Sequence, residues 1–292
     1  MGTEHAEHIE HIEGRVAEVG GAAVRRVLPT KGRRTVGAWC FVDHFGPMVP
    51  GRDGPGVQIG PHPHIGLQTV TWLLDGELVH VDSVGSRQPI RPGQLNLMTA
   101  GHGVSHAEEP SPAPGAIHGA QLWVAQPEAT RHGEPAFEHH AHLPSVTTGH
   151  LDLTVLLGSF GGVTSPARTD TAIVGVALRG SAAGETTLSL DPAFEHAVVA
   201  LRGSVRADGD AVPVGELAVL GLGRDQVRIA TTGPIDALLL GGEPFGAELF
   251  MWWNFVGRTA AEIDQARADW NAGADRFGSV DSSLPRIAAP DR

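Results

Sequence analysis

Turn residues interrupt the apolar runs of this chain along its whole length, and this pattern limits the fold more than any other feature. The chain has 39 glycines and 21 prolines among 292 residues. Between them lie short runs rich in valine, leucine and threonine, such as residues 68–74 and 78–84. Runs of this length are typical of β-strands, and the Asp75–Gly76 turn between these two predicts a hairpin. The pattern therefore predicts an all-β chain.

One stretch near the C-terminus, residues 259–270, predicts a helix instead. Thr259 and Glu262 stand in the T-x-x-E spacing of a capping box, which satisfies free amides at a helix start. Ile263, Ala266 and Trp270 then recur at helical spacing and would share one face. We expect this face to pack against the rest of the protein.

Two pairs of polar residues have the spacing of a metal site. His62 and His64 are two residues apart, as are His106 and Glu108, and His106 follows His64 by 42 residues. Residues i and i+2 of a strand point to one face, so each pair can aim two ligands at one point. Three imidazoles and one carboxylate suit iron, zinc, copper or nickel. The absence of cysteine ligands argues against a purely structural zinc site.

The remaining histidines fit other interpretations. We interpret His80 as a strand residue without a named partner and His102 as a loop residue near the site. His118 is expected to pack or to support the ligands, and Asp43 and His44 are candidates to accept hydrogen bonds from them. Two further clusters are interpreted as surface features: His5, His8 and His11, and His139, His140 and His142.

Several segments of the chain together carry a resemblance to a known family. They are VRRVLP (24–29), FVDHFGPM (41–48), HPHIGLQTVTWLLDGELVHVDSVG (62–85), IRPGQLNLMTAGHGVSHAEE (90–109), HGAQLWV (118–124) and WWNFVGRTAAEIDQARADW (252–270). By these segments the chain resembles the pirin family of the cupin superfamily. The resemblance spans nearly the whole chain, in the family's order.

The resemblance implies two tandem double-stranded β-helix (cupin) barrels with a C-terminal helix. It also implies that His62, His64, His106 and Glu108 bind one divalent metal ion, expected to be Fe(II), with Zn, Ni, Cu, Mn or Co as alternatives. Many pirins read HPHRGFET where this chain reads HPHIGLQT, so Ile65 and Gln68 replace an arginine and a glutamate. For that reason, the substrates of the better-known pirins are a less direct guide to the substrate of this chain.

The strand pattern predicts the division of the chain. We expect a disordered tail over 1–13, a metal-binding barrel over 14–131 and a linker over 132–147. A second barrel over 148–274 would lack metal ligands and include the helix 259–270, and 275–292 would be a flexible tail.

Composition and charge exclude several classes of function. The formal net charge of −12 argues against direct binding to nucleic acid or anionic membranes. Cys40 is the only cysteine, so no disulfide within the chain is available, and its apolar surroundings predict a buried, inert thiol. The sequence contains no run of 18 apolar residues, about the length that a membrane-spanning helix needs. We expect a cytoplasmic monomer.

Two functions follow from the resemblance. The first is a metal-dependent dioxygenase of a flavonol-type substrate such as quercetin, with dioxygen as co-substrate and Glu108 as both ligand and catalytic proton acceptor. The second is an iron- or redox-sensing regulatory protein that acts through a protein partner. A catalytic site would need an apolar cavity over the metal, for which the candidate walls are Ile65, Leu67, Trp72, Leu97 and Trp123.

Overall fold

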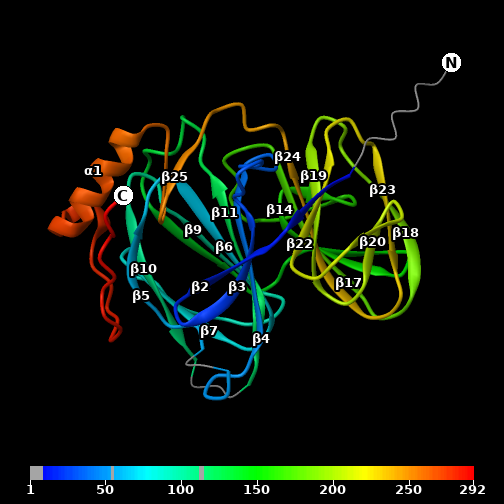
Figure 1. The fold of residues 1–292 in the computed structure, drawn as a ribbon, viewed down its shortest axis with the longest axis horizontal. Coiled ribbons are helices and arrows are strands. Elements are labelled where there is room, and N and C mark those ends of the chain that lie inside the picture. The colour runs from blue at the N-terminus through cyan, green and yellow to red at the C-terminus, as the bar shows by residue number, and fades with distance from the viewer. Residues whose placement is uncertain (1–8, 54–55, 112–114) are drawn as a thin grey trace. The chain divides into compact units, whose positions relative to one another are not determined.

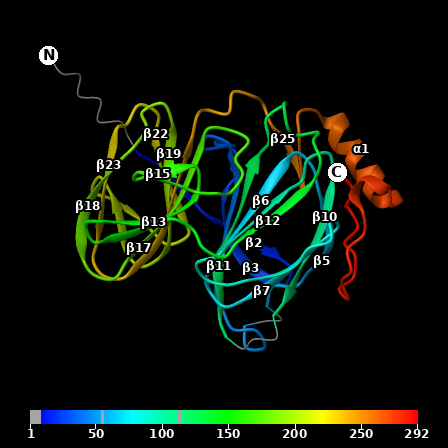
Figure 2. The ribbon, with the colours of Figure 1, turned by 180° about the vertical axis from the view of Figure 1, so that it is seen from behind.

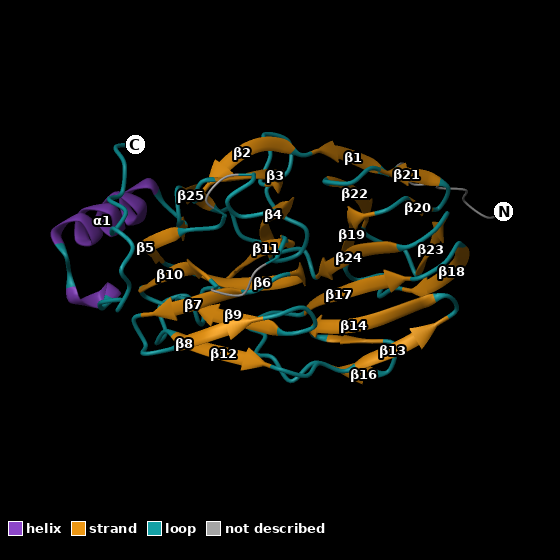
Figure 3. Ribbon diagram, turned by 90° about the horizontal axis from the view of Figure 1, so that it is seen from below, coloured by secondary structure: helices purple, strands orange, loops and turns teal. Residues whose placement is uncertain are grey.

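A computed structural model describes residues 9–53, 56–111 and 115–292, and these form two compact units. The first barrel unit contains Val16–Arg34, Cys40–His142 and Gly246–Arg292. The second barrel unit contains residues 9–15, Thr35–Trp39 and Leu143–Phe245. In both units the described residues are mainly strands, and the α-helix belongs to the first (Figures 1 and 3). The expected all-β class with two barrels and a C-terminal helix is confirmed.

The first barrel consists of a seven-stranded and a four-stranded sheet (Figure 2). The larger sheet has the order β12-β9-β6-β11-β4-β3-β2, with bounds β2 Arg15–Val19, β3 Ala22–Leu28, β4 Trp39–Met48, β6 Leu67–Asp75, β9 Leu95–Thr99, β11 Ile117–Ala125 and β12 Ala136–His140. The smaller sheet has the order β5-β10-β7-β8, with bounds β5 Ile59–His64, β7 Leu78–Asp82, β8 Arg87–Ile90 and β10 Val104–Pro110.

The core of this barrel lies between its two sheets. Val24, Phe45 and Leu73 of the larger sheet pack in one cluster with Leu78 and Ile90 of the smaller sheet. Apolar residues of both sheets are thereby removed from water, and this burial is the main driving force for pairing strands that are distant in sequence.

The predicted hairpin between residues 68–74 and 78–84 is wrong. Both runs are strands, β6 and β7, but they belong to different sheets. Strand β6 is already paired on both sides, with β9 and β11, so neither of its edges is free for β7. The chain changes sheet at Gly76, which has a φ of 85° and on which a Cβ would lie 2.5 Å from the Ala116 carbonyl oxygen.

The second barrel repeats the same two-sheet plan. Its seven-stranded sheet has the order β1-β22-β19-β24-β17-β14-β13, with bounds β1 Glu10–Glu13, β13 Ser145–Thr148, β14 Leu151–Leu157, β17 Ile173–Gly180, β19 Glu195–Arg202, β22 Glu216–Gly221 and β24 Ile235–Gly242. The four-stranded sheet β18-β23-β20-β21 contains β18 Gly184–Ser189, β20 Val205–Ala207, β21 Asp210–Val212 and β23 Gln226–Thr231, and a short ribbon pairs β15 Ser159–Phe160 with β16 Val163–Thr164. Apolar residues of both sheets form its core.

The structure divides the chain differently from the expected boundaries at its ends. Residues 1–8 of the expected tail lie outside the described residues, but Glu10–Glu13 form β1, which pairs with β22 of the second barrel. At the other end, the segment 275–292 contains a short 3₁₀ helix, Asp275–Phe277, and Ile287 donates its amide to the Pro61 carbonyl. Strand pairing orders the first segment, and the buried side chains of Phe277 and Ala289 order the second.

The expected linker, 132–147, also contains two strands. Strand β12 pairs with β9 of the first barrel, and β13 pairs with β14 of the second. Each is the edge strand of its sheet and is only partly buried, so its sequence is polar and lacks the apolar signal of a central strand.

The helix α1, Ala260–Ala272, belongs to the first barrel unit rather than to the second. It follows a hairpin of β25 (Phe250–Trp252) and β26 (Phe255–Gly257), and its buried face consists of Ile263, Ala266 and Trp270, as predicted. This face packs with Phe255 and Phe277 in a separate apolar cluster. No helix among the described residues is long and apolar enough to cross a membrane.

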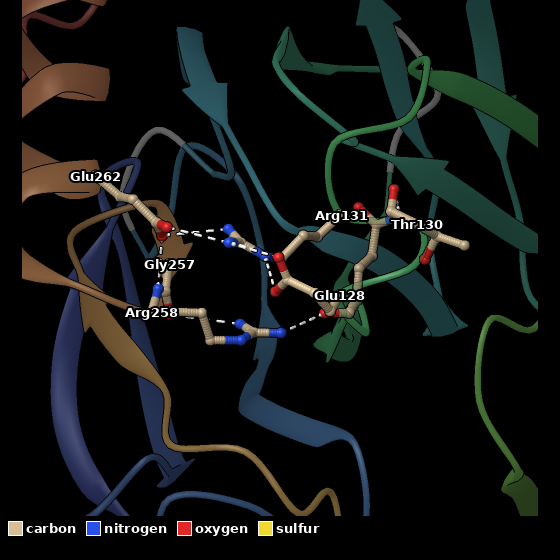
Figure 4. A network of polar contacts seen from close by, with 7 residues as sticks. Glu128, Thr130, Arg131, Gly257, Arg258 and Glu262 are labelled. Atoms are coloured by element: carbon tan, nitrogen blue, oxygen red, sulfur yellow. Dashed lines mark hydrogen bonds and ion pairs between the residues drawn. The ribbon is translucent and has the colours of Figure 1, made fainter.

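A charged network fastens the start of α1 to the loop that follows β11 (Figure 4). Thr259 accepts a hydrogen bond from the Glu262 amide, and the Glu262 carboxylate accepts one from the Arg258 amide. The guanidinium of Arg131 is shared between Glu128 and Glu262, with nitrogen–oxygen distances of 2.5 and 3.0 Å. Local residues therefore satisfy the amides at the helix start, and Arg131 ties the carboxylate of Glu262 to a segment that is distant in sequence.

Candidate metal centre

Strands β5 and β10 bring the two predicted ligand pairs side by side. The strands are antiparallel, and their register places His64 opposite Val104 and His62 opposite His106. After His106 the register shifts, so that Glu108 lies opposite Ile59. The register thus brings the HxH pair and the first residue of the HxE pair together, and the bulge displaces the second residue.

The three histidines His62, His64 and His106 form a tight buried group. Each offers one ring nitrogen, and these nitrogens all lie within 4.8 Å of one another. The Nε2 atoms of His64 and His106 are 3.1 Å apart. Among the described residues, this is the group of histidine, cysteine and carboxylate side chains with the geometry to hold a metal ion.

Each imidazole of this group has a hydrogen-bond partner at Nδ1. His62 Nδ1 lies 2.9 Å from the Gly60 carbonyl oxygen, and His64 Nδ1 lies 2.9 Å from that of Asn254. A carbonyl oxygen only accepts, so each Nδ1 donates its proton and each Nε2 keeps a free lone pair. His106 Nδ1 lies 3.3 Å from a fourth imidazole, that of His80. His80 therefore has a partner at the site, which its sequence context did not reveal.

The turn between β25 and β26 presents the Asn254 carbonyl to His64. Trp253 in this turn has a φ of 52°, a left-handed conformation that is uncommon for a bulky residue. The hairpin is held against the ligand strand because the Val256 amide donates to the Ile65 carbonyl. The C-terminal hairpin thus positions a candidate ligand of the N-terminal half.

The imidazoles are held neutral by burial. Desolvation lowers the pKa of His62 to about 4, and it lowers those of His64 and His106 well below the ordinary value. Neutral imidazoles are the form that binds metals. The Nε2 atoms of His64 and His106, which are 3.1 Å apart, are close enough to bind one cation together. The donor set therefore fits a divalent metal ion.

Glu108 is buried in the same cavity but does not belong to the tight histidine group. Burial raises the pKa of its carboxyl to about 7. This carboxyl changes its charge near neutral pH, a property that suits a group that either binds a cation or accepts a proton.

A cavity of about 430 Å³ opens onto the histidine group. It is lined on one side by Phe41 and Trp123, whose rings stack at 3.9 Å, and by Arg26 and Gln121 among the polar groups. Of the predicted walls, only Trp123 lines it. The others do not: Ile65, Leu67, Trp72 and Leu97. Side chains alternate between the two faces of a strand, and inward-facing residues of β4 and β11 supply the wall instead.

The expected acceptors Asp43 and His44 have other partners. The Asp43 carboxylate forms two hydrogen bonds with Arg26, of 2.7 and 2.6 Å. The Nε2 of His44 lies 2.8 Å from that of His118, and both rings are buried. His102 lies in a loop, where its ring contacts the Gly133 carbonyl oxygen.

Comparison with known proteins agrees with this architecture. The family model described as Pirin matches residues 21–124, and that of the pirin C-terminal cupin domain matches residues 175–278. A Pseudomonas aeruginosa protein named "Putative quercetin 2,3-dioxygenase" is 46% identical over 290 residues, which cover 98% of this chain and 92% of that protein. A "Pirin-like protein" of Caulobacter vibrioides is 36% identical over 279 residues, or 92% of this chain and 95% of that protein.

A solved structure is similar over the same extent. The crystal structure of a quercetin 2,3-dioxygenase from Acinetobacter baumannii has a TM-score of 0.93 and 42% identity, and covers 97% of this chain and 95% of that one. The chain belongs to the pirin family, a group of proteins with two cupin barrels.

Proposed function

We propose that this pirin is a metal-dependent dioxygenase that acts on a flavonol-type substrate such as quercetin. Its metal would be Fe(II), held by His62, His64 and His106, with Glu108 as the fourth ligand. The observation that carries the proposal is the group of three neutral imidazoles whose lone pairs converge on an aromatic-lined cavity. The names of the relative from P. aeruginosa and of the solved structure from A. baumannii support the substrate class.

The chain's own residues would bind and orient the substrate. The stacked rings of Phe41 and Trp123 offer an apolar wall to a flat polycyclic molecule. Gln121 accepts a hydrogen bond from the Thr71 hydroxyl at 2.9 Å, which leaves its amide hydrogens to donate into the cavity. The volume of about 430 Å³ lies within the range of cavities that enclose small organic ligands.

Glu108 would accept the proton of a substrate hydroxyl. A general base works best when its pKa lies near the working pH. Burial raises the pKa of the metal-free Glu108 carboxyl toward that range, which supports this role. A bound iron ion would supply a Lewis acid and redox chemistry toward dioxygen. Burial of all four candidate ligands would keep bulk water away from the reacting groups.

Metal content and oxygen uptake test this proposal together. After anaerobic loading with ferrous ion, we expect about one iron per wild-type chain by mass spectrometry, and loss of most of it in His106→Ala. The loaded wild type should consume oxygen in a saturable manner when quercetin is added. Little iron in the wild type would contradict the metal site. Full iron without oxygen uptake would contradict the enzyme and favour the regulatory alternative.

Glu108→Gln isolates the proton acceptor. We expect this variant to retain much of its iron but to lose turnover, because the amide cannot take a proton. Glu109→Gln is the matched control, because Glu109 is the next residue of β10 and its carboxylate pairs with Arg87 outside the cavity. Turnover by Glu108→Gln equal to that of the control would contradict the assigned role.

A further inference from the structure

His106 differs from the other two imidazoles in what lies behind it. His62 and His64 donate to backbone carbonyls, whereas His106 contacts the side chain of His80 at 3.3 Å. His80 Nε2 lies in turn 2.8 Å from the Asp82 carboxylate. Asp82 and His80 are only 3% and 5% exposed, so water does not compete for these contacts.

The Asp82 carboxylate determines which ring nitrogens of His80 and His106 carry protons. One of its oxygens accepts hydrogen bonds from the amides of Val84 and Ser86, at 3.0 and 2.9 Å. The other oxygen faces His80 Nε2, which must donate to it. His80 Nδ1 is then an acceptor, so His106 Nδ1 donates and His106 Nε2 keeps its lone pair.

The aromatic ring of Phe137 holds the His80 ring in place. The two rings are stacked with centroids 4.5 Å apart and an interplanar angle of 14°. Phe137 belongs to the edge strand β12, while His80 and Asp82 belong to β7. Strand β7 pairs with β10 so that Asp82 lies opposite His106. Three side chains from two strands thus fix the orientation of the His106 imidazole.

We propose that Asp82 and His80 are positioning residues that hold His106 in its metal-binding tautomer and thereby set the metal affinity of the site. The inference rests on the proposed metal site but concerns residues that touch neither metal nor substrate. Backbone carbonyls can only accept, so the tautomers of His62 and His64 are fixed by the fold. The tautomer of His106 depends instead on the carboxylate of Asp82, which acts through His80.

Asp82→Asn tests the effect of Asp82 on the tautomers of His80 and His106, because asparagine has nearly the same shape as aspartate. The amide oxygen of the asparagine can keep the turn amides of Val84 and Ser86, which leaves its NH₂ group facing His80. His80 must then accept at Nε2 and donate at Nδ1, and His106 is forced to accept at Nδ1 and carry its proton at Nε2. The metal-binding lone pair is lost. The same inversion of tautomer occurs when the aspartate of a serine-protease triad is replaced by asparagine.

The first measurement is the affinity for zinc(II), by competition with a chromophoric chelator. We expect Asp82→Asn to bind zinc about 10–100-fold more weakly than the wild type. Glu138→Gln is the matched control, because it makes the same carboxylate-to-amide change beside a different imidazole, that of His140, whose Nε2 lies 2.9 Å from the Glu138 carboxylate. We expect the control to bind zinc as the wild type does.

The second measurement reads the tautomers directly. Nitrogen-15 NMR of the metal-free proteins should show His80 protonated at Nε2 in the wild type and at Nδ1 in Asp82→Asn. A merely structural role for Asp82 would not reverse this assignment. Wild-type affinity or an unchanged tautomer in a folded Asp82→Asn variant would overturn the inference.

Two further variants cover the case in which Asp82→Asn does not fold. His80→Gln can accept from His106 and donate to Asp82, so it should retain most of the zinc affinity. His80→Phe keeps the stacking on Phe137 but offers no acceptor, so it should lose affinity. Equal affinities of these two variants would overturn the inference. Absence of zinc binding by the wild type would instead overturn the proposed metal site itself.

Discussion

The affinity of the candidate site for a divalent metal should fall between pH 8 and pH 6, because binding must displace about one proton. A ligand that must lose a proton before it binds the metal lowers the apparent affinity. The affinity is divided by one plus the ratio of the proton concentration to the acid dissociation constant of that ligand. With a pKa of about 7 for Glu108, this factor is about 11 at pH 6 and about 1.1 at pH 8. With a pKa of about 4 for His62, the factor stays near 1 at both.

We therefore expect the zinc affinity of the wild type to fall about tenfold from pH 8 to pH 6. The sign follows from the raised pKa of Glu108, because a carboxyl that is protonated below pH 7 must release its proton to the solvent on binding. Three exposed imidazoles with ordinary pKa values of about 6.5 would instead lose about 60-fold over the same range.

Zinc dissociation constants measured by chelator competition at pH 6, 7 and 8 check this reasoning. Glu108→Gln should show a change of less than about twofold, since no carboxyl proton remains to be displaced. Glu109→Gln, with its carboxylate outside the cavity, should behave as the wild type does. A 60-fold fall in the wild type would mean that the imidazoles are not held neutral by burial. A flat response in the wild type would mean that Glu108 is not a ligand.

Three further predictions concern stability, each measured as the free energy of unfolding in urea. Gly60→Ala should destabilise the protein by about 2–3 kcal/mol, because the added Cβ would lie 1.9 Å from the Pro285 carbonyl oxygen. Gly32→Ala is the control and should change the free energy of unfolding little, because a Cβ there has open space around it. Leu73→Ala should cost about 2–5 kcal/mol, since this side chain is 1% exposed in the first core, and a smaller cost would mean that the core refills the space. Arg131→Met should cost about 1 kcal/mol, because the partly buried Glu262 carboxylate loses a cation, and no loss would show that solvent replaces it.

The sequence predicts those parts of the site that depend on local spacing. The alternation of side chains along a strand is sufficient to place His62 with His64, and their convergence with His106 needs only that two strands pair. The helix α1 was predictable for the same reason, because Thr259 and the spacing of its apolar residues are local signals.

The supporting groups were not predictable, because they depend on pairing between distant strands. The hairpin interpretation joined β7 to β6, so His80 had no apparent partner, whereas β7 pairs with β10 and places Asp82 opposite His106. The acceptor for His64 is a backbone carbonyl, and any residue type at 254 would supply one. The partly buried strand β12 has too few apolar residues to differ from a linker.

The order of segments along the chain has a consequence for synthesis. The first barrel contains Cys40–His142 and Gly246–Arg292, and the segment Leu143–Phe245 between them belongs to the second barrel. His64 and the carbonyl that orients it are 190 residues apart. On the ribosome, all three imidazoles emerge before the second barrel is made, and the turn that orients His64 emerges after it. The complete ligand group therefore forms late in translation, and a chain that ended after the second barrel would carry every histidine of the site without the hairpin that orients His64.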